Sequence, residues 1–349
     1  MLHFECDYTE GAHPAVIEKI CSTNMEQTCG YANDRYCEDA RSLIRQLVGI
    51  PDADVHFLVG GTQSNRTVIS ALLRPHQGVV AATTGHIAVH ETGAVEASGH
   101  KVLTVHSADG KLKASDVKEL VMAHYADADH EHCVQPGMVY VSFPTETGTL
   151  YSKKELEQLS GICCELGLPL FIDGARLGYG LMADGNDLTL PEIARMCDVF
   201  TIGGTKCGAL FGEAVVFTGN ALGRDFRYLI KQNGGMLAKG RLLGLQFLAL
   251  LSDGIYFEIS KRADRLAMKV RTALEAAGLE LCSPCTTNQQ FVYMPVPVLE
   301  KLEEKYVFSV APCGREGWRL VRICTSWATT DDAVDALIAD ISACMEEKI

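Results

Sequence analysis

Two segments decide the fold of this chain: LPLFIDGARLGYG at residues 168–180 and DVFTIGGTK at residues 198–206. The apolar run in each segment is typical of a buried strand in a parallel sheet. The first run ends at Asp173, and the second is followed by two glycines and Lys206. Because ligands of open α/β sheets bind beyond the carboxyl ends of the strands, we expect this carboxylate and this amine to face the same crevice.

An acid and a lysine at neighbouring strand ends suit pyridoxal phosphate. Lys206 can form the Schiff base, while Asp173 pairs with the pyridinium nitrogen and keeps it protonated. An ordinary ion pair at the protein surface is the alternative, because charged residues at loop starts are usually solvated. The cofactor interpretation therefore requires a phosphate site and a ring-stacking group elsewhere in the chain.

Length and composition limit the classes of protein to which this chain can belong. Its 349 residues fit one large domain and a smaller one, and 47% of them are hydrophobic, as in a globular protein. The formal net charge of −13 argues against a nucleic-acid or anionic-membrane partner. The apolar runs are shorter than the roughly 20 residues of a membrane span, and the first residues do not read as a signal peptide. We therefore expect a cytoplasmic protein.

The 14 cysteines are scattered through apolar segments, which is typical of small buried side chains rather than of a disulfide framework. Cys282 and Cys285 form a lone CxxC pair. No second pair stands at the spacing of a zinc ribbon, so we expect no metal site.

A candidate phosphate site lies between HFLVGG at residues 56–61, a strand-like run, and TQSNRTVISALL at residues 62–73, which has helical spacing. Backbone N–H groups of Gly60, Gly61 and Thr62, at the positive end of the helix dipole, suit an anion. The segment matches no nucleotide fingerprint. A plain tight turn with Thr62 as the N-cap is the alternative.

A candidate stacking group is His86, which directly follows the strand-like VVAATTG at residues 79–85. A histidine just past a strand end can lay its ring over a planar cofactor. Zinc binding by His86 together with His90, four residues later on a predicted helix, is the alternative. The HExxH order is absent and no third ligand is evident, so stacking is favoured.

Strand-like and helix-like segments alternate up to about residue 218, which predicts a doubly wound domain with a mostly parallel sheet. We expect residues 1–230 to form an N-terminal arm and this large domain, and residues 231–349 to form a smaller C-terminal α/β domain. Arg322 lies within an apolar run of the second part. Because an unpaired guanidinium would be costly there, Arg322 should meet a carboxylate of the protein or of a substrate.

These segments in this order resemble the threonine aldolase family of fold-type-I enzymes that use pyridoxal phosphate. The resemblance covers essentially the whole chain and is carried by GGTQSN, GHIAVHETGA, FIDGARLGYG, CDVFTIGGTK and LVRICTSW. It implies that Lys206 is the Schiff-base lysine and that Asp173 is the partner of the pyridine nitrogen. It also implies that His86 is the stacking ring.

The resemblance further implies where the phosphate and the substrate bind. Gly61 and Thr62 would be part of the phosphate cup, and Arg176 and Arg322 would bind the substrate carboxylate. The implied reaction is retro-aldol cleavage of L-threonine or L-allo-threonine to glycine and an aldehyde. A β-eliminating lyase or an aminotransferase of the same fold is the alternative.

Three positions depart from the pattern of the family that this chain resembles. Cys6 takes the place of a serine that contacts the substrate carboxylate. Tyr31 is not followed by the usual glycine, yet it still looks like the residue that reaches a neighbouring subunit's site. Glu146 stands where the better-studied branch has a second active-site histidine. We expect Glu146 to act on the β-hydroxyl through a water or to position it, with His86 as the competing base.

The resemblance also implies a homotetramer with its sites at dimer interfaces. Lys231 and Lys239, on either side of the glycines at residues 234 and 235, are candidates to reach a partner's phosphate.

Overall fold

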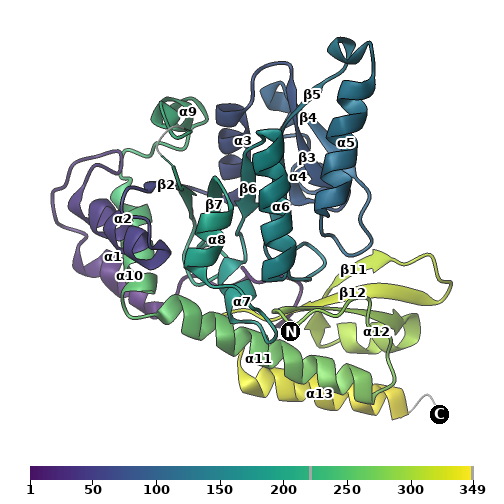
Figure 1. Ribbon diagram of the computed structural model, residues 1–349. Coiled ribbons are helices and arrows are strands. Elements are labelled where there is room, and N and C mark those ends of the chain that lie inside the picture. Colours follow the sequence, from purple (N-terminus) through teal and green to yellow (C-terminus); the bar gives the residue numbers. More distant parts are fainter. Residues whose placement is uncertain (220–221, 347–349) are drawn as a thin grey trace.

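The computed structural model describes residues 1–219 and 222–346 (Figure 1). Over these residues, the large domain is built on a seven-stranded sheet. Every strand pairing in it is parallel except those of β8, which runs antiparallel to both of its neighbours. This arrangement confirms the expected mostly parallel α/β sheet. In spatial order the strands are β2 (Asp54–Leu58), β8 (Glu213–Phe217), β7 (Val199–Gly203), β6 (Leu170–Asp173), β5 (Gln135–Ser142), β3 (Gln77–Ala82) and β4 (Lys101–Val105).

Helices cover both faces of this sheet, because successive side chains of a strand point to opposite faces and both faces are apolar. In β3, Val79 and Ala81 belong to one core and Val80 and Ala82 to the other. The first core includes side chains of α3 (Gly61–Leu72) and α9 (Phe226–Gln232). The second includes side chains of α1 (Pro14–Ser22), α2 (Arg35–Val48), α5 (Ala114–Ala126), α6 (Lys153–Leu166), α8 (Leu190–Met196) and α10 (Arg241–Ser252). The doubly wound prediction is therefore confirmed.

Local sequence signals fix several of these helices. Ser152 and Glu155 form a reciprocal capping box at the start of α6, and Gly167 ends the helix in the left-handed conformation, at φ 66°. Two shorter helices, α4 (His86–Val89) and α7 (Leu177–Met182), follow β3 and β6 and lie near the carboxyl ends of those strands. Single 3-10 turns occur at Glu96–Ser98 and His130–His132.

The smaller domain packs three helices against an antiparallel sheet with the strand order β11 (Ser309–Pro312), β12 (Trp318–Cys324) and β9 (Gln289–Pro295). The helices are α11 (Ile255–Ala276), α12 (Val296–Glu303) and α13 (Asp331–Glu346). In Figure 1, α11 runs below the large domain and continues beneath the small sheet. It therefore joins the two domains.

The first residues of the chain complete the small domain. β1 (Leu2–His3) pairs in parallel with β10 (Tyr306–Val307), and Phe4 is buried in the small-domain core. After Phe4, the chain passes from the small domain to the large domain.

The chain passes from the large-domain core to the small-domain core at a later point than the expected boundary between residues 230 and 231. Leu243 and Phe247 of α10 are buried in the large-domain core, whereas Leu266 and Val270 of α11 are buried in the small-domain core. The reason is that α10 lies against α1 and α2, so the packing changes from one core to the other within α11.

Within the described residues, no single helix has the length and apolar composition to cross a membrane. The bent pair α10 and α11 passes that test together, with an angle of 70° between the two helices.

Candidate active site

The centre of the candidate site is Asp173, the last residue of β6, which is buried. Its Oδ2 accepts hydrogen bonds from Asn65 Nδ2 at 2.8 Å and from the Tyr140 hydroxyl at 2.6 Å. Its Oδ1 accepts one from the backbone N–H of Ala175 at 2.9 Å. These three donors hold the carboxyl group of Asp173 in place at the end of β6.

Asn65 links Asp173 to a second buried acid. The same Nδ2 atom donates to Glu91 Oε1 at 2.7 Å, and Glu91 Oε1 also accepts from His86 Nδ1 at 2.7 Å. Because an ionised carboxylate only accepts hydrogen bonds, Nδ1 must carry the proton, which fixes the tautomer and the orientation of the His86 ring. A chain of buried polar groups therefore runs from Asp173 to His86.

This network also sets the charge of His86. Burial alone would lower the pKa of His86, but the hydrogen bond to Glu91 and the charges of Asp173 and Glu91 outweigh it. The pKa of His86 is therefore raised, and its cationic form is favoured.

Glu146 supports the start of α4. Its Oε1 accepts hydrogen bonds from the backbone N–H of His86 at 2.9 Å and from the hydroxyl of Ser142. Burial raises the pKa of Glu146, and the nearby charge of Asp173 adds to this, while the two hydrogen bonds offset only part of it. Glu146 is thus not an ordinary exposed glutamate, and one of its oxygens is engaged by two donors.

Lys206 combines a fixed backbone with an unpaired amine. Its carbonyl oxygen accepts from the Tyr179 hydroxyl at 2.6 Å, and the carbonyl of Gly203 accepts from the Tyr256 hydroxyl at 3.0 Å. A side chain at Gly203 would collide with the backbone of Ala175, so the close approach of β7 to the segment after β6 requires glycine there. In the described part of the chain, Lys206 Nζ has neither a hydrogen bond nor an ion pair.

Arg176 is held by an acid from the N-terminal segment. Its Nε and Nη2 donate to Asp7 Oδ2 and Oδ1 at 2.7 and 2.9 Å, a two-point contact. Asn288 Nδ2 also donates to Asp7 at 2.9 Å. Burial would raise the pKa of Asp7, but the charges of Arg176 and Lys206 and these hydrogen bonds lower it below its usual value. Asp7 is therefore an ionised partner of Arg176.

Arg322, on β12, is only partly satisfied by protein groups. Its Nη2 donates to the carbonyl of Glu5 at 2.7 Å, and its Nη1 lies 3.4 Å from Gln289 Oε1. Its Nε is buried and has no hydrogen-bond partner among the described residues. The expected protein carboxylate is absent from these contacts, so a ligand carboxylate would complete the guanidinium. Cys6 is half-buried next to Asp7, and burial raises the pKa of its thiol.

The candidate phosphate site is the start of α3. The helix begins at Gly61, and the N-cap is Gly60 rather than Thr62, so the alternative with Thr62 as the cap is wrong. No side chain caps the helix, and nothing lies within 4 Å of the positions where side chains of Gly60 and Gly61 would begin. The first backbone N–H groups of the helix are thus open to an anion.

Tyr31 contacts the segment that contains Lys231 and Ala238. Its backbone N–H donates to the carbonyl of Ala238, its carbonyl accepts from Arg227 Nη2, and Lys231 Nζ lies 5.0 Å from the centre of its ring. Lys239 directly follows Ala238 in the chain. Tyr31 therefore lies beside Lys231 and contacts the residue before Lys239.

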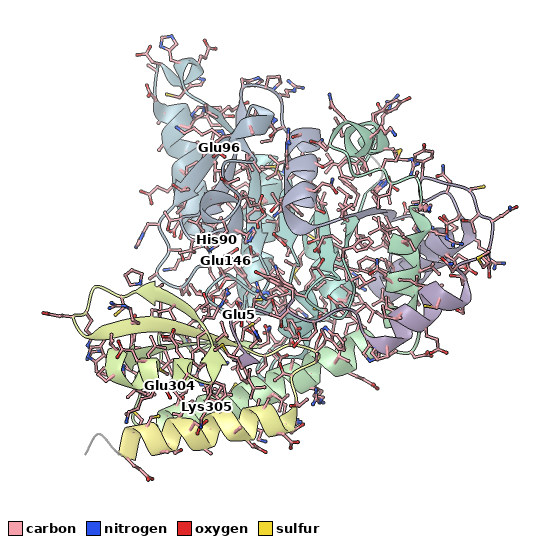
Figure 2. All side chains as sticks on the ribbon, turned by 180° about the vertical axis from the view of Figure 1, so that it is seen from behind. Glu5, His90, Glu96, Glu146, Glu304 and Lys305 are labelled. Carbon is pink, nitrogen blue, oxygen red and sulfur yellow. The ribbon has the colours of Figure 1, made fainter. Side chains whose placement is uncertain are left out.

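The sequence analysis assigned no role to Asn65, Glu91, Tyr140 and Asp7, all of which contact predicted site residues. Asn65 stands inside the GGTQSN segment and Tyr140 on the strand before Glu146, so both were near quoted motifs, but their partners are distant in the chain. Figure 2 shows Glu5, His90 and Glu146 in the region where the large domain meets the small one. Within the described residues, no group of three metal-binding side chains occurs.

The site contains the three groups that pyridoxal phosphate requires. They are the unpaired amine of Lys206 after β7, the hydrogen-bonded carboxyl group of Asp173 at the end of β6, and the uncapped start of α3. Fold and site together define a pyridoxal-phosphate enzyme of fold type I. More particularly, the chain belongs to the beta-eliminating lyase family, whose model matches residues 4–296.

Named relatives agree with this family. A low-specificity L-threonine aldolase of a Pseudomonas species is 31% identical, over 98% of this chain and 97% of its own. The solved structure of a Leishmania major threonine aldolase is 41% identical, with a TM-score of 0.96 over 99% of this chain and 100% of the other. A Thermus thermophilus aspartate aminotransferase, 16% identical over 99% of this chain and 91% of its own, with a TM-score of 0.70, shares the fold alone.

Proposed function

We propose that this protein cleaves L-threonine and L-allo-threonine to glycine and acetaldehyde with pyridoxal phosphate as its cofactor. The observation that carries this proposal is the free amine of Lys206 near the buried, triply hydrogen-bonded carboxylate of Asp173. The names of the Pseudomonas and Leishmania relatives support the choice of threonine over other amino acids.

Cofactor binding would use three parts of the site. Lys206 would hold the cofactor through its unpaired amine, and the open N–H groups of Gly61 and Thr62 would bind its phosphate. Asp173, which three donors hold in place, would pair with the ring nitrogen and keep the proton on it. When bound, the cofactor supplies an electron-withdrawing ring that takes up the electron pair of the cleaved bond.

Substrate binding would centre on Arg322. A substrate carboxylate can accept from its unpartnered Nε, which would otherwise stay buried without a hydrogen bond. Arg176 would contribute its charge and its remaining nitrogen, Nη1, since Asp7 accepts from the other two. Cys6, beside Asp7, would be a neighbour of the carboxylate rather than a donor of the kind that serine provides.

The side of the site opposite the carboxylate would be shaped by His86 and Glu146. The hydrogen bond to Glu91 orients the His86 ring, so that it can lie over the cofactor. Glu146 would position His86 through its backbone N–H, and its raised pKa also suits contact with the β-hydroxyl through a water.

We also propose a homotetramer with sites at dimer interfaces. Tyr31 and Tyr228 support this proposal, because they are 44% and 77% exposed and lie on one face beside Lys231. Exposed groups of large aromatic side chains often mark a protein–protein interface. In such an assembly Tyr31 and one of Lys231 and Lys239 would reach the partner's site. A cytoplasmic location is supported by the cysteines, for which the structure shows no disulfide among the described residues.

The test is an assay of the purified protein with L-threonine, L-allo-threonine, D-threonine and L-serine, with identification of the products. We expect acetaldehyde and glycine from the two L-threonine isomers. Pyruvate and ammonia from L-serine without aldehyde from threonine would instead identify a β-eliminating lyase. A requirement for an α-keto acid would identify an aminotransferase.

A further inference from the structure

His90 is a histidine at the candidate site that the proposed mechanism does not use. It is the residue that ends α4, where its backbone N–H donates to the carbonyl of His86 at 2.9 Å. Its side chain is exposed, and its ring centre lies 5.6 Å from that of His86 with 54° between the ring planes. Neither of its ring nitrogens has a hydrogen bond within the described residues. The imidazole is therefore available to a ligand.

Cleavage of a β-hydroxy amino acid requires a base with a free lone pair near the β-hydroxyl. Glu146 Oε1 is engaged by two donors, and the Nδ1 of His86 is engaged by Glu91. The proposed function assigns the His86 ring to the cofactor, and although burial alone would lower the pKa of this ring, the hydrogen bond to Glu91 and the charges of Asp173 and Glu91 raise it. His90 differs from both, because burial lowers its pKa and the positive charges of His86, Arg322 and Arg176 lower it further. At neutral pH His90 is a neutral imidazole.

The charges that act on His90 include those of the arginines assigned to the substrate carboxylate. Its pKa responds to Arg322 and Arg176, the two arginines to which the proposed function assigns the substrate carboxylate. In a β-hydroxy-α-amino acid, the hydroxyl oxygen is only three bonds from the carboxylate carbon. A base for this hydroxyl must therefore lie where the charges of those arginines act on it, as they do on His90. The adjacent acid, Glu91, is already occupied by His86 and Asn65.

We propose that His90 is the catalytic base that accepts the β-hydroxyl proton of the amino-acid substrate. In this step the O–H bond breaks and its proton moves to a free ring nitrogen of His90. The C–O bond becomes the carbonyl of the aldehyde, the Cα–Cβ bond breaks, and its electron pair stays with Cα. This inference rests on the proposed aldolase function.

The experiment compares the holoenzyme with His90→Asn, and uses His132→Asn, an exposed histidine of the 3-10 turn before β5, as the matched control. Three readouts are taken: visible absorbance of the bound cofactor, exchange of the glycine α-proton in D₂O followed by NMR, and kcat/KM for L-threonine from pH 5 to 9. Glycine exchange needs the cofactor, Lys206 and the carboxylate site, but it needs no base for a β-hydroxyl.

For His90→Asn we expect kcat/KM for L-threonine to fall at least about 100-fold, the lower end of the contribution of a general base. Cofactor absorbance and glycine exchange should stay within about twofold of wild type. In wild type, kcat/KM should fall with decreasing pH below the ordinary histidine value of about 6.5, and this acid limb should be absent from the variant. The control variant should behave as wild type in all three readouts.

Two results would overturn this inference and leave the proposed function intact. In the first, the wild-type enzyme cleaves threonine and the His90→Asn variant has an unchanged kcat/KM. In the second, that variant loses threonine cleavage and glycine exchange to the same extent. A loss of threonine cleavage in Glu146→Gln but not in His90→Asn would identify Glu146 as the catalytic base. If the wild-type enzyme exchanges the glycine proton but releases no aldehyde from threonine, the proposed function is wrong, and the inference fails with it.

Discussion

Asn65→Ala should destabilise the protein, and the loss should depend on pH. Asn65 Nδ2 donates to Glu91 and Asp173, so the two acceptor oxygens lie within about 5.5 Å of each other. Hydrogen bonds to charged groups contribute about 1.5–3 kcal/mol each, so the loss of two costs at least about 3 kcal/mol. The two carboxylates repel each other by about 3 kcal/mol at an effective dielectric constant of 20, and without the amide no hydrogen bond offsets this repulsion.

The pH dependence follows from that repulsion. In the variant, one of the two carboxyl groups gains a raised pKa in the folded state, and protonation relieves the repulsion at low pH. A group with a raised folded pKa stabilises at low pH and loses that contribution as the pH rises. The difference between wild type and Asn65→Ala should therefore be larger at pH 8 than at pH 5.5.

Urea unfolding of the cofactor-free protein, followed by circular dichroism at both pH values, measures this difference. Ser70→Ala, on the same helix, is the control, because the Ser70 hydroxyl donates only to the carbonyl of Arg66 one turn earlier. Its effect should be within about 0.5 kcal/mol of zero. A loss in Asn65→Ala below about 1 kcal/mol and equal at both pH values would refute the reasoning.

Three further substitutions test other parts of the site. Lys206→Ala should abolish aldehyde release, and the borohydride-treated chain should no longer gain the mass of the cofactor; normal turnover would contradict the assignment. Arg322→Lys should lower kcat/KM for L-threonine steeply, because an ammonium cannot give the paired hydrogen bonds of a guanidinium; an unchanged value would make Arg322 a structural residue. Asp7→Asn should destabilise by about 3–5 kcal/mol at pH 7, since it leaves the Arg176 charge buried without its partner. Because the folded pKa of Asp7 is lowered, its contribution is complete above its unfolded value of about 3.9 and is lost as the pH falls through the folded value. Thermal melting at pH 7 and at pH 3 should show the two proteins converging in acid, and a constant difference would speak against the ion pair.

The sequence was sufficient for the parts of the fold that depend on local patterns. The run with helical spacing at residues 62–73 matches α3, Gly61–Leu72, to within one residue at each end, because its apolar spacing lies within one continuous segment of the chain. Asp173 and Lys206 were placed at strand ends for the same reason, since each apolar run is short and is bounded by glycines.

Contacts between distant segments could not be predicted in this way. Asn65 is 26 residues from Glu91 and 108 from Asp173, and Asp7 is 169 residues from Arg176. No periodicity connects such pairs, so the hydrogen-bond network that fixes His86 was invisible in the sequence. The position of α10 was missed for a related reason: its apolar residues suit either core, and only the fold shows that they lie against α1 and α2.

The pairing of β1 with β10 has a consequence for the order of folding. Leu2 meets Tyr306, and the carbonyl of Phe4 accepts from the backbone N–H of Cys324, so the small domain closes only when segments from opposite ends of the chain come together. Contacts of such high sequence separation form slowly, because the entropy of closing a long loop is lost before they are made. During synthesis, the parallel sheet can assemble while residues near 306 and 324 are still being added. We therefore expect the contact between Glu5 and Arg322 to form last, and activity to appear later in refolding than the bulk of the secondary structure.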